Sequence, residues 1–474
     1  MKNIFKLLPM RKKVGFSLAS LLFILLFFEI GIRIVFFQKK SNYVFAISAV
    51  YYFISEEYME YKASKTPNVQ GPYKVIAQDF TGDGVIDLTI SYYATANSYD
   101  KVGKYTSGLF TIEKGDGKGN FVQLGLNTVD VPHRMNHIPR IFNITAGDID
   151  NDGLNDLVVG FESFVSVLKN LGNGKFEEMM LYRTESAAKG VKLADLDNDG
   201  ILDLLYIARG TARPGDTPSG KLYIRQGLGQ WKFGAAILDD AGISAYYIET
   251  ADFNDDGYLD IFVPNERIST LTYWINPGRD IFNATYSKAS QLAANSLLIQ
   301  NHNIERRVLE ISGKLINDVR FADFNGDGHL DLITANWGSN NISLFLGNGK
   351  DFQKEQLLPG GENCVFLAIG DLDNDSDLDF VVTHWTDDIL SVFLNKGNGE
   401  FATMRDYKTG LGNYGVTIFD ANADHNLDII TANYKAGSIS ILNGRGDGTF
   451  DNAINVPKGF HKVADRWVPK IRTD

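Results

Sequence analysis

Seven short stretches of the chain place oxygen-bearing side chains at a fixed spacing. Each follows or closely approaches the pattern Asp-x-[Asp/Asn/Thr]-x-Asp-Gly-x-x-Asp, and they begin at Asp79, Asp148, Asp195, Asp252, Asp323, Asp371 and Asp420. Oxygens from positions 1, 3, 5 and 9, together with a backbone carbonyl at position 7, can surround one hard cation, and calcium prefers about six to eight such ligands. The spacing therefore predicts up to seven calcium sites.

The predicted ligands are the residues at positions 1, 3, 5, 7 and 9 of each loop. In chain order they are Asp79, Thr81, Asp83, Val85 and Asp87; Asp148, Asp150, Asp152, Leu154 and Asp156; Asp195, Asp197, Asp199, Ile201 and Asp203; Asp252, Asn254, Asp256, Tyr258 and Asp260; Asp323, Asn325, Asp327, His329 and Asp331; Asp371, Asp373, Asp375, Asp377 and Asp379; Asp420, Asn422, Asp424, Asn426 and Asp428. Three loops depart from the pattern, because Thr81 replaces a carboxylate or amide and because Ser376 and His425 replace the sixth-position glycine. An EF-hand is excluded, since its last carboxylate is the twelfth residue of the loop.

Strand-forming residues surround every loop. Apolar residues precede each motif, and a short β-prone run follows it, such as Leu157-Val158-Val159. Further along each unit a Gly/Asn turn closes on a phenylalanine, as at Phe176, Phe401 and Phe450. This order predicts four antiparallel strands per unit, which we name A to D, with the acidic loop joining A to B. One such small sheet cannot bury both of its faces, so the units must pack radially or stack.

The repeats resemble those of the FG-GAP/VCBS-type proteins, which include integrin α-subunit heads and many bacterial extracytoplasmic proteins. The stretch ANWGSNNISLFLGNG, residues 335–349, is close to the usual wording of that repeat. The resemblance extends from about Tyr73 to Phe450 and implies an all-β, seven-bladed β-propeller with calcium in the loop between the first two strands of a blade. We therefore expect a propeller over residues 72–474.

The amino-terminal region has the features of a membrane anchor. The apolar segment from Val14 to Phe37 would form about 36 Å of helix, enough to cross a hydrocarbon core of about 30 Å, and its charges Glu29 and Arg33 can pair at i,i+4. Basic residues are more numerous before the segment than after it, which predicts a cytoplasmic tail over residues 1–13, a signal anchor over 14–37, a linker over 38–71 and a propeller in the periplasm or at the cell surface. A cleaved signal peptide is the alternative.

Composition narrows the function classes. The formal net charge is −12, which disfavours binding to phosphate backbones, so nucleic acid is not an expected partner. Cys364 is the single cysteine of the chain, so an intrachain disulfide is excluded.

Irregular spacing between the repeats points to one face of the propeller. Because strands alternate in direction, the A–B and C–D connections share one rim, and the B–C and D–A connections share the other. Extra residues occur near 94–104 and 210–219, between strands B and C, and after Phe121 and Phe282, where we expect D–A connections. All four insertions are therefore expected on the rim opposite the acidic loops, where variable loops usually carry binding. The tail after Phe450 is expected to supply a last strand that closes the ring.

The predicted ligand-binding face combines these insertions with residues five or six positions after the last motif aspartate. Its members are Tyr93, His133, Arg134, Arg209, His302, Asn336, Trp337, His384, Trp385, Asn433 and Tyr434. Aromatic rings beside amides and arginines suit sugar rings or acidic polymers. The alternative is that each aromatic residue caps the end of strand B.

Three functions fit this sequence. The leading hypothesis is a membrane-anchored, calcium-binding propeller that recognises a polysaccharide or protein ligand without catalysis. The second is a lyase or hydrolase acting on acidic glycans, for which His133, Arg134, His302, His384 and Tyr434 are the candidate residues. The third is a structural subunit of an envelope complex. No nucleophile elbow or phosphate-binding loop occurs, so no catalytic residue is predicted.

Overall fold

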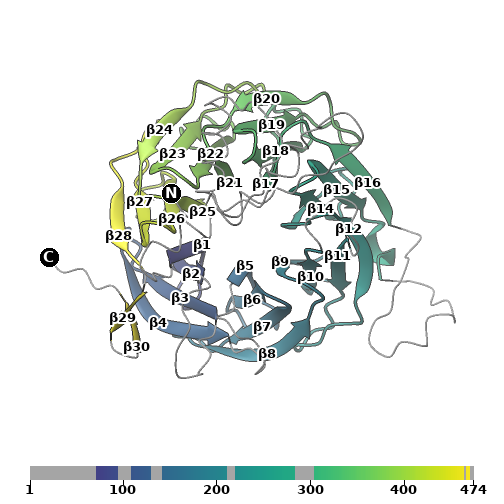
Figure 1. The fold of residues 1–474 in the computed structure, drawn as a ribbon, viewed down its shortest axis with the longest axis horizontal. Coiled ribbons are helices and arrows are strands. Elements are labelled where there is room, and N and C mark those ends of the chain that lie inside the picture. Colours follow the sequence, from purple (N-terminus) through teal and green to yellow (C-terminus); the bar gives the residue numbers. More distant parts are fainter. Residues whose placement is uncertain are drawn as a thin grey trace, which may run out of the picture. The chain divides into compact units, whose positions relative to one another are not determined.

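A computed structural model describes residues 71–93, 108–129, 141–210, 219–282, 304–458, 460–463 and 466–469. These residues form seven four-stranded antiparallel sheets and one two-stranded hairpin. The seven sheets are arranged as the blades of a ring, with chain order running once around it (Figure 1). The predicted all-β propeller is confirmed. The described residues contain no helix long and apolar enough to span a membrane, and the predicted anchor at 14–37 lies outside them.

Each blade is one contiguous segment whose strands pair in the order A, B, C, D. Blade 1 contains β1 (Gly71–Gln78), β2 (Asp87–Tyr93), β3 (Gly108–Gly115) and β4 (Phe121–Val129); blade 2 contains β5 (Ile141–Gly147), β6 (Asp156–Phe161), β7 (Phe164–Asn170) and β8 (Phe176–Arg183). Blade 3 contains β9 (Ala188–Ala194), β10 (Asp203–Ala208), β11 (Gly220–Arg225) and β12 (Ile237–Gly242); blade 4 contains β13 (Glu249–Ala251), β14 (Asp260–Asn265), β15 (Thr270–Ile275) and β16 (Glu305–Glu310). Blade 5 contains β17 (Ile316–Ala322), β18 (Asp331–Asn336), β19 (Asn341–Phe345) and β20 (Gln356–Pro359); blade 6 contains β21 (Cys364–Gly370), β22 (Asp379–His384), β23 (Ile389–Phe393) and β24 (Arg405–Lys408); blade 7 contains β25 (Asn413–Phe419), β26 (Asp428–Asn433), β27 (Ser438–Leu442) and β28 (Ile454–Pro457).

Burial explains the residue pattern along the strands. Every residue of β6, β10, β14, β18, β22 and β26, the B strands of blades 2 to 7, is buried. Neighbouring blades cover both faces of these strands, so they read as continuous apolar runs rather than as alternating ones. The outer strands β20, β24 and β28 are largely exposed, including the apolar residues Leu357 and Ile454. Strand A lies innermost and strand D outermost in the blades of Figure 1.

The core is divided among the contacts between adjacent blades. Seven apolar clusters each combine side chains of two neighbouring blades, including blade 7 with blade 1. In the blade 7–1 cluster Ile90 and Tyr92 pack with Ile430 and Ile439. Blade 1 contains four strands from its own segment, so the ring closes by side-chain packing and loop contacts without an exchanged strand.

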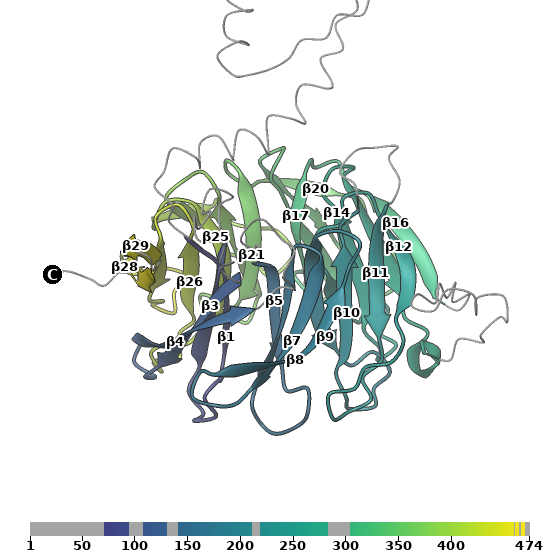
Figure 2. The same cartoon turned by 60° about the horizontal axis from the view of Figure 1, so that its bottom comes forward.

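Two expectations about connections are wrong. The tail forms a separate hairpin of β29 (Phe460–Val463) and β30 (Arg466–Pro469), and neither strand joins a blade. Residues 283–303 lie outside the described residues, but they connect β15 to β16 and therefore form a C–D connection. The closing phenylalanine begins strand D in blades 1 and 2 but precedes it in blade 4, so the insertion after Phe282 still belongs to the rim of the acidic loops. The other three long connections join B to C or D to A, as expected, and the strand ends that they join lie on the opposite rim. Figure 2 shows the blades turned by 60° from Figure 1, with strands of each sheet running between the two rims.

Candidate metal-binding loops and the opposite face

All seven acidic loops close in the same way. In each, the first aspartate accepts a hydrogen bond at Oδ2 from the backbone N–H of the sixth residue, at 2.8–3.0 Å. In each, the fifth-position aspartate accepts at Oδ1 from the N–H of the seventh residue, at 2.8–3.0 Å. The carboxylates therefore organise the loop backbone even before a ligand is considered.

The two loops without a sixth-position glycine keep this geometry. Ser376 has φ of 76° and His425 has φ of 70°, the left-handed conformation that glycine adopts in the other five loops. The fourth position is also left-handed, and in loop 7 it is Ala423, with φ of 61°. Replacing glycine in these loops thus makes the left-handed backbone less favourable but does not change the path of the backbone.

The ninth-position aspartates, which begin strand B, tie the acidic loop to the end of strand C in each blade. In loop 2, Asp156 is fully buried, its Oδ2 accepts from Ile149 N at 2.9 Å, and its Oδ1 accepts from Asn170 N on strand C at 2.8 Å. The same two contacts recur in the other six loops. Burial raises the pKa of Asp156, Asp203, Asp260 and Asp379 to about 7, and that of Asp331 to about 6, against the lowering effect of these N–H donors.

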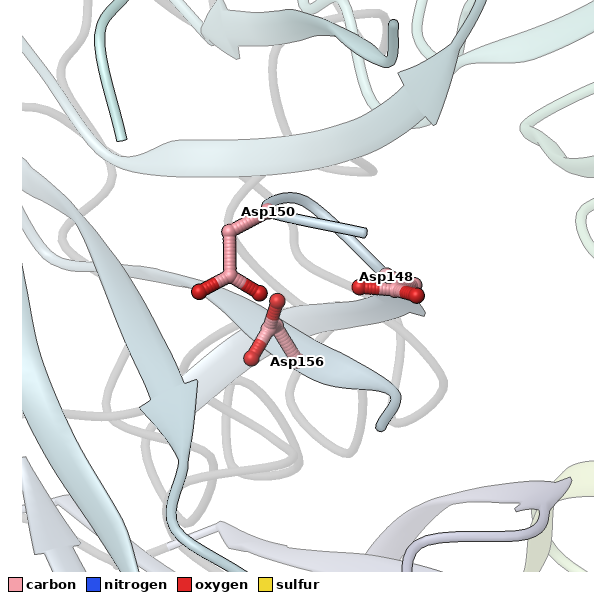
Figure 3. A group of neighbouring side chains, drawn as sticks. All are labelled: Asp148, Asp150 and Asp156. Atoms are coloured by element: carbon pink, nitrogen blue, oxygen red, sulfur yellow. The ribbon is translucent and has the colours of Figure 1, made fainter. Parts of the chain in front are cut away.

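Several loops present carboxylates that could together hold a metal ion. Within the described residues the convergent groups are Asp148, Asp150 and Asp156; Asp195, Asp197 and Asp199; and Asp371, Asp373 and Asp379. Figure 3 shows the first group, in which the carboxylates of Asp150 and Asp156 point toward each other and that of Asp148 lies at their side.

Orphaned oxygens test whether these loops fit a cation. Thr81 Oγ1, Asp150 Oδ1, Asp197 Oδ1 and Asp373 Oδ1 are buried and have no hydrogen-bond partner, and all four belong to the third position of a loop. An unpaired buried oxygen is unfavourable in the absence of a donor or a cation. The donor set, made only of oxygen atoms, therefore fits a hard divalent cation, for which calcium is the best match.

Part of the predicted ligand-binding face lies inside the sheets. Asn336, His384 and Asn433 are fully buried. Asn336 Nδ2 donates to Ser343 Oγ at 2.8 Å, Asn433 Nδ2 donates to Ser440 Oγ at 2.7 Å, and His384 shares hydrogen bonds with Glu362 O and Ser391 Oγ. Burial also lowers the pKa of His384 below its usual value. The expectation that these side chains are exposed is wrong, because strand B is covered on both faces to its end.

The aromatic members of the predicted face come together in one cluster. Trp337, Trp385 and Tyr434 pack with a second set of apolar side chains from the starts of the A strands. That second set is Tyr73, Tyr246, Tyr247, Val365, Phe366 and Tyr414. Trp385 is 7% exposed and stacks on Tyr434 with ring centroids 5.1 Å apart, whereas Trp337 and Tyr434 are half-buried. The A strands run toward the acidic loops, so this aromatic cluster closes the centre of the ring at the opposite face.

Arg209 and Tyr93 have different positions. Arg209 Nη2 pairs with Glu266 Oε2 at 2.7 Å, so two residues at matching positions of blades 3 and 4 neutralise each other. Tyr93 ends β2, and its side chain is outside the described part. His133, Arg134 and His302 also lie outside the described residues.

A model of the FG-GAP-like repeat matches residues 148–206 and 323–382. Each matched segment begins at one acidic loop and ends just after the next, so it covers strands B, C and D of one blade and strand A of the following blade. The described residues contain seven such loops, each followed by strands B, C and D. The chain contains FG-GAP-like repeats within a seven-bladed β-propeller.

Solved structures similar to this FG-GAP-repeat propeller come from diverse proteins. A lectin of Agrocybe aegerita, in a structure concerning recognition of non-reducing terminal N-acetylglucosamine, is 17% identical, with 81% of this chain and 93% of that chain covered and a TM-score of 0.49. BBS1N in complex with ARL6DN is 11% identical, with 79% and 97% covered and a TM-score of 0.49. A protein of unknown function from Desulfotomaculum acetoxidans is 10% identical, with 81% and 99% covered and a TM-score of 0.46. No curated protein matches the chain.

The centre of the FG-GAP-repeat propeller contains a charged layer that the sequence analysis missed. Arg320 Nη1 lies 3.0 Å from both Glu249 Oε2 and Asp318 Oδ1, and Lys192 Nζ lies 2.5 Å from Glu249 Oε1. Lys74 donates to Asn143 Oδ1 at 3.0 Å and lies 4.4 Å from the ring centroid of Tyr247. Burial lowers the pKa of Lys74 to about 7. Their spacing could have revealed this layer in the sequence. Each of these charges stands three or five residues before the first aspartate of a loop, which places it on the inward side of strand A.

Two cavities adjoin this layer. The larger, about 590 Å³, opens toward the acidic loops and is lined by Glu249, Arg320 and apolar residues of β17, β21 and β25. The smaller, about 120 Å³, contains Lys74, Lys192 and Asp318 and shares Glu249 and Arg320 with the larger one. Of the residues considered for catalysis, His384 and Tyr434 are described, and they are held in separate surroundings, the first within blade 6 and the second in the aromatic cluster.

Proposed function

We propose that this protein is a calcium-stabilised recognition propeller that binds a polysaccharide or protein ligand on the face opposite its acidic loops, without catalysis. The segment 14–37 anchors it in a membrane, with residues 1–13 in the cytoplasm, 38–71 as a linker and the propeller at 72–474 in the periplasm or at the cell surface. The N-terminal part of this proposal rests on the apolar segment and its flanking basic residues.

The aromatic cluster is the observation that carries the binding proposal. Trp337 and Tyr434 are half-buried at the face where the strands joined by the connections 94–107, 130–140 and 211–218 end. Rings held by packing beneath them and open on one side offer apolar area at little conformational cost. Loops of variable length around such a platform are the usual place for ligand contacts.

The calcium part of the proposal rests on the loops. The orphaned oxygens of Asp197 and Asp373, in loops 3 and 6, and the convergent carboxylates of the same two loops support a hard cation bound by oxygen atoms. A cation there would satisfy these oxygens and reduce the repulsion among the carboxylates of each loop.

The test is binding of the full chain, in detergent with calcium, to a panel of neutral and acidic polysaccharides. We expect Trp337→Ala and Tyr434→Ala each to weaken binding at least tenfold, because losing one buried ring contact removes about 1–3 kcal/mol and about 1.4 kcal/mol is one decade of affinity. Lys350→Ala, an exposed residue on the rim of the acidic loops, is the control and should bind as the wild type does. Trp385→Ala is not a useful variant, since this ring is buried and its loss should destabilise the fold.

Two outcomes would contradict the proposal, and a third would narrow it to a protein ligand. Release of shortened or unsaturated products would show an enzyme instead of a binding protein. Retention that neither substitution weakens would exclude the aromatic face as the site. If the wild type and both variants bind the polysaccharides only weakly, in calcium and in chelator, polysaccharide is excluded as the ligand and a protein ligand remains. Direct binding of a protein ligand to the same two variants would then test the aromatic face.

A further inference from the structure

One position at or directly after the end of strand C differs among the blades. It directly precedes the residue whose N–H binds the ninth-position aspartate. From blade 1 to blade 7 the residues at this position are Lys114, Lys169, Gln226, Ile275, Leu346, Leu394 and Asn443. A cationic side chain therefore stands there in blades 1 and 2 and a neutral one in blades 3 to 7.

Lys169 places its ammonium group among the carboxylates of loop 2. Its Nζ is hydrogen-bonded to Asp150 Oδ2 and lies 2.8 Å from Asp152 Oδ2, so it contacts the third and fifth positions of the loop at once. Trp231 of blade 3 donates from Nε1 to the same Asp150 Oδ2 at 2.8 Å, and its ring lies 5.2 Å from Nζ. The Lys169 side chain is 25% exposed, so the ammonium is held by these partners and only partly hydrated.

Lys114 makes the corresponding contact in loop 1. Its Nζ lies 2.7 Å from Asp83 Oδ2, the fifth-position carboxylate. Loop 1 has Thr81 in place of a third-position carboxylate or amide, so it offers a divalent cation less negative charge than loop 2 does. In loop 3, by contrast, neutral Gln226 donates from Nε2 to Asp197 Oδ2 at 2.9 Å.

We propose that Lys169 and Lys114 are built-in counter-ions that stand in for a metal ion in loops 2 and 1, so that these two loops remain metal-free under conditions that fill loops 3 to 7. This inference rests on the proposed calcium binding of the other loops. The reason is electrostatic: an ammonium and a divalent cation that share the same carboxylates repel each other, and the ammonium is covalently tethered at the site. Removal of the lysine should allow loop 2 to bind calcium, because Asp150 Oδ1 is buried without a partner and could then contact the ion.

The experiment counts bound ions per chain. The full chain in detergent is stripped with chelator and dialysed to equilibrium against about 1 mM calcium, a concentration typical of extracellular calcium modules; bound calcium is measured by atomic emission. Lys169→Met and Lys114→Met remove the ammonium groups, and Gln226→Lys introduces one in loop 3. Lys175→Met and Lys118→Met are matched controls, since both lysines are exposed on the adjacent hairpin turns.

We expect Lys169→Met and Lys114→Met each to bind one more ion than the wild type, Gln226→Lys to bind one fewer, and both controls to match the wild type. In chelator, Lys169→Met should also melt at a lower temperature than Lys175→Met and recover when calcium is added. An unchanged ion count in Lys169→Met overturns the inference. If the wild type binds no calcium, the calcium part of the proposed function fails. In that case one calcium ion bound by Lys169→Met would still support the counter-ion role of Lys169, and no ion bound by this variant would overturn it.

Discussion

At the scale of single residues, each acidic loop needs two left-handed backbone conformations. Five loops use glycine at the sixth position, and loop 7 uses Ala423 and His425 at its fourth and sixth positions, both with positive φ. A left-handed conformation costs an L-residue with a Cβ about 1–2 kcal/mol relative to glycine. Loop 7 therefore retains the geometry of its neighbours at the expense of stability.

Ala423→Gly should stabilise the protein. Ala423 is exposed, so the change removes backbone strain without leaving a cavity. Relief of strain outweighs the added freedom of the unfolded chain, and we expect a gain of about 1 kcal/mol in the free energy of unfolding, measured by urea denaturation in calcium. Ala436→Gly, at an exposed turn alanine without positive φ, is the control and should be neutral or slightly destabilising. A loss of stability in Ala423→Gly would contradict the left-handed assignment.

At the scale of elements, the contact between blades 7 and 1 includes a buried ion pair. Lys458 Nζ, directly after β28, is hydrogen-bonded to Glu113 Oε2 on β3, and the two side chains are 9% and 0% exposed. Gly119 N of blade 1 also donates to Ala421 O of blade 7 at 2.9 Å, the same contact that Gly399 makes with Phe324 between blades 6 and 5. The closing junction thus repeats the ordinary blade contact and adds one charge pair.

Lys458→Met should loosen this junction strongly. The substitution leaves the Glu113 carboxylate buried without its counter-ion, a change that typically costs about 3–5 kcal/mol. We expect a lower unfolding midpoint in urea, and we expect Lys458→Met combined with Glu113→Gln to recover much of the loss. Lys408→Met is the control, because Lys408 stands at the end of the D strand of blade 6 and pairs with Asp388 while 77% exposed. Equal losses in Lys458→Met and Lys408→Met would show that the buried pair contributes no more than a surface pair.

The elements also show what the sequence could and could not predict. Fixed spacing around each loop defined strands A, B and C, because the motif, the following apolar run and the Gly/Asn turn are all local signals. Strand D carried no comparable signal, so the insertion after Phe282 was assigned to the wrong connection. The largely exposed strands β20, β24 and β28 have only four residues each, and their weak sequence pattern is a consequence of lying at the outer edge.

The candidate site was predictable only where it is local. The loop ligands follow from spacing within nine residues, whereas the burial of Asn336 and His384 depends on neighbouring blades that cover strand B. The charged layer around Arg320 was missed because its charges come from four separate A strands, each of which contributes one or two of them. Long-range assembly, which no local pattern encodes, brings them together.

At the scale of the whole molecule, buried carboxylates and the central layer make stability depend on pH. Without metal, Asp156, Asp203, Asp260 and Asp379 have a folded pKa of about 7 and Asp331 about 6, above their unfolded value near 3.8. The folded state then binds more protons between about pH 4 and 7, so stability falls as pH rises through that window. Lys74 acts in the opposite sense, since its folded pKa of about 7 lies below 10.5 and stability rises between these two values.

In chelator we therefore expect a minimum of thermal stability near pH 7, measured as melting temperature across pH 5 to 9. Calcium should raise the melting temperature most at pH 7 and remove the decline between pH 5 and 7, because a bound cation favours the ionised carboxylates. Lys74→Met should flatten the rise above pH 7 and leave the calcium effect unchanged. A melting temperature that does not respond to chelator at any pH would contradict calcium binding by the loops.

The contiguity of the blades has a consequence for how such a gene can change. Every sheet is built from one uninterrupted stretch of chain, and blade 1 borrows nothing from the carboxyl terminus. Duplication or deletion of one stretch, from the start of one inner strand to the start of the next, would add or remove a complete sheet with its own loop and leave all others whole. A propeller whose two ends share a sheet lacks this freedom at the shared blade. The number of blades in this architecture can therefore change by one whole blade at a time.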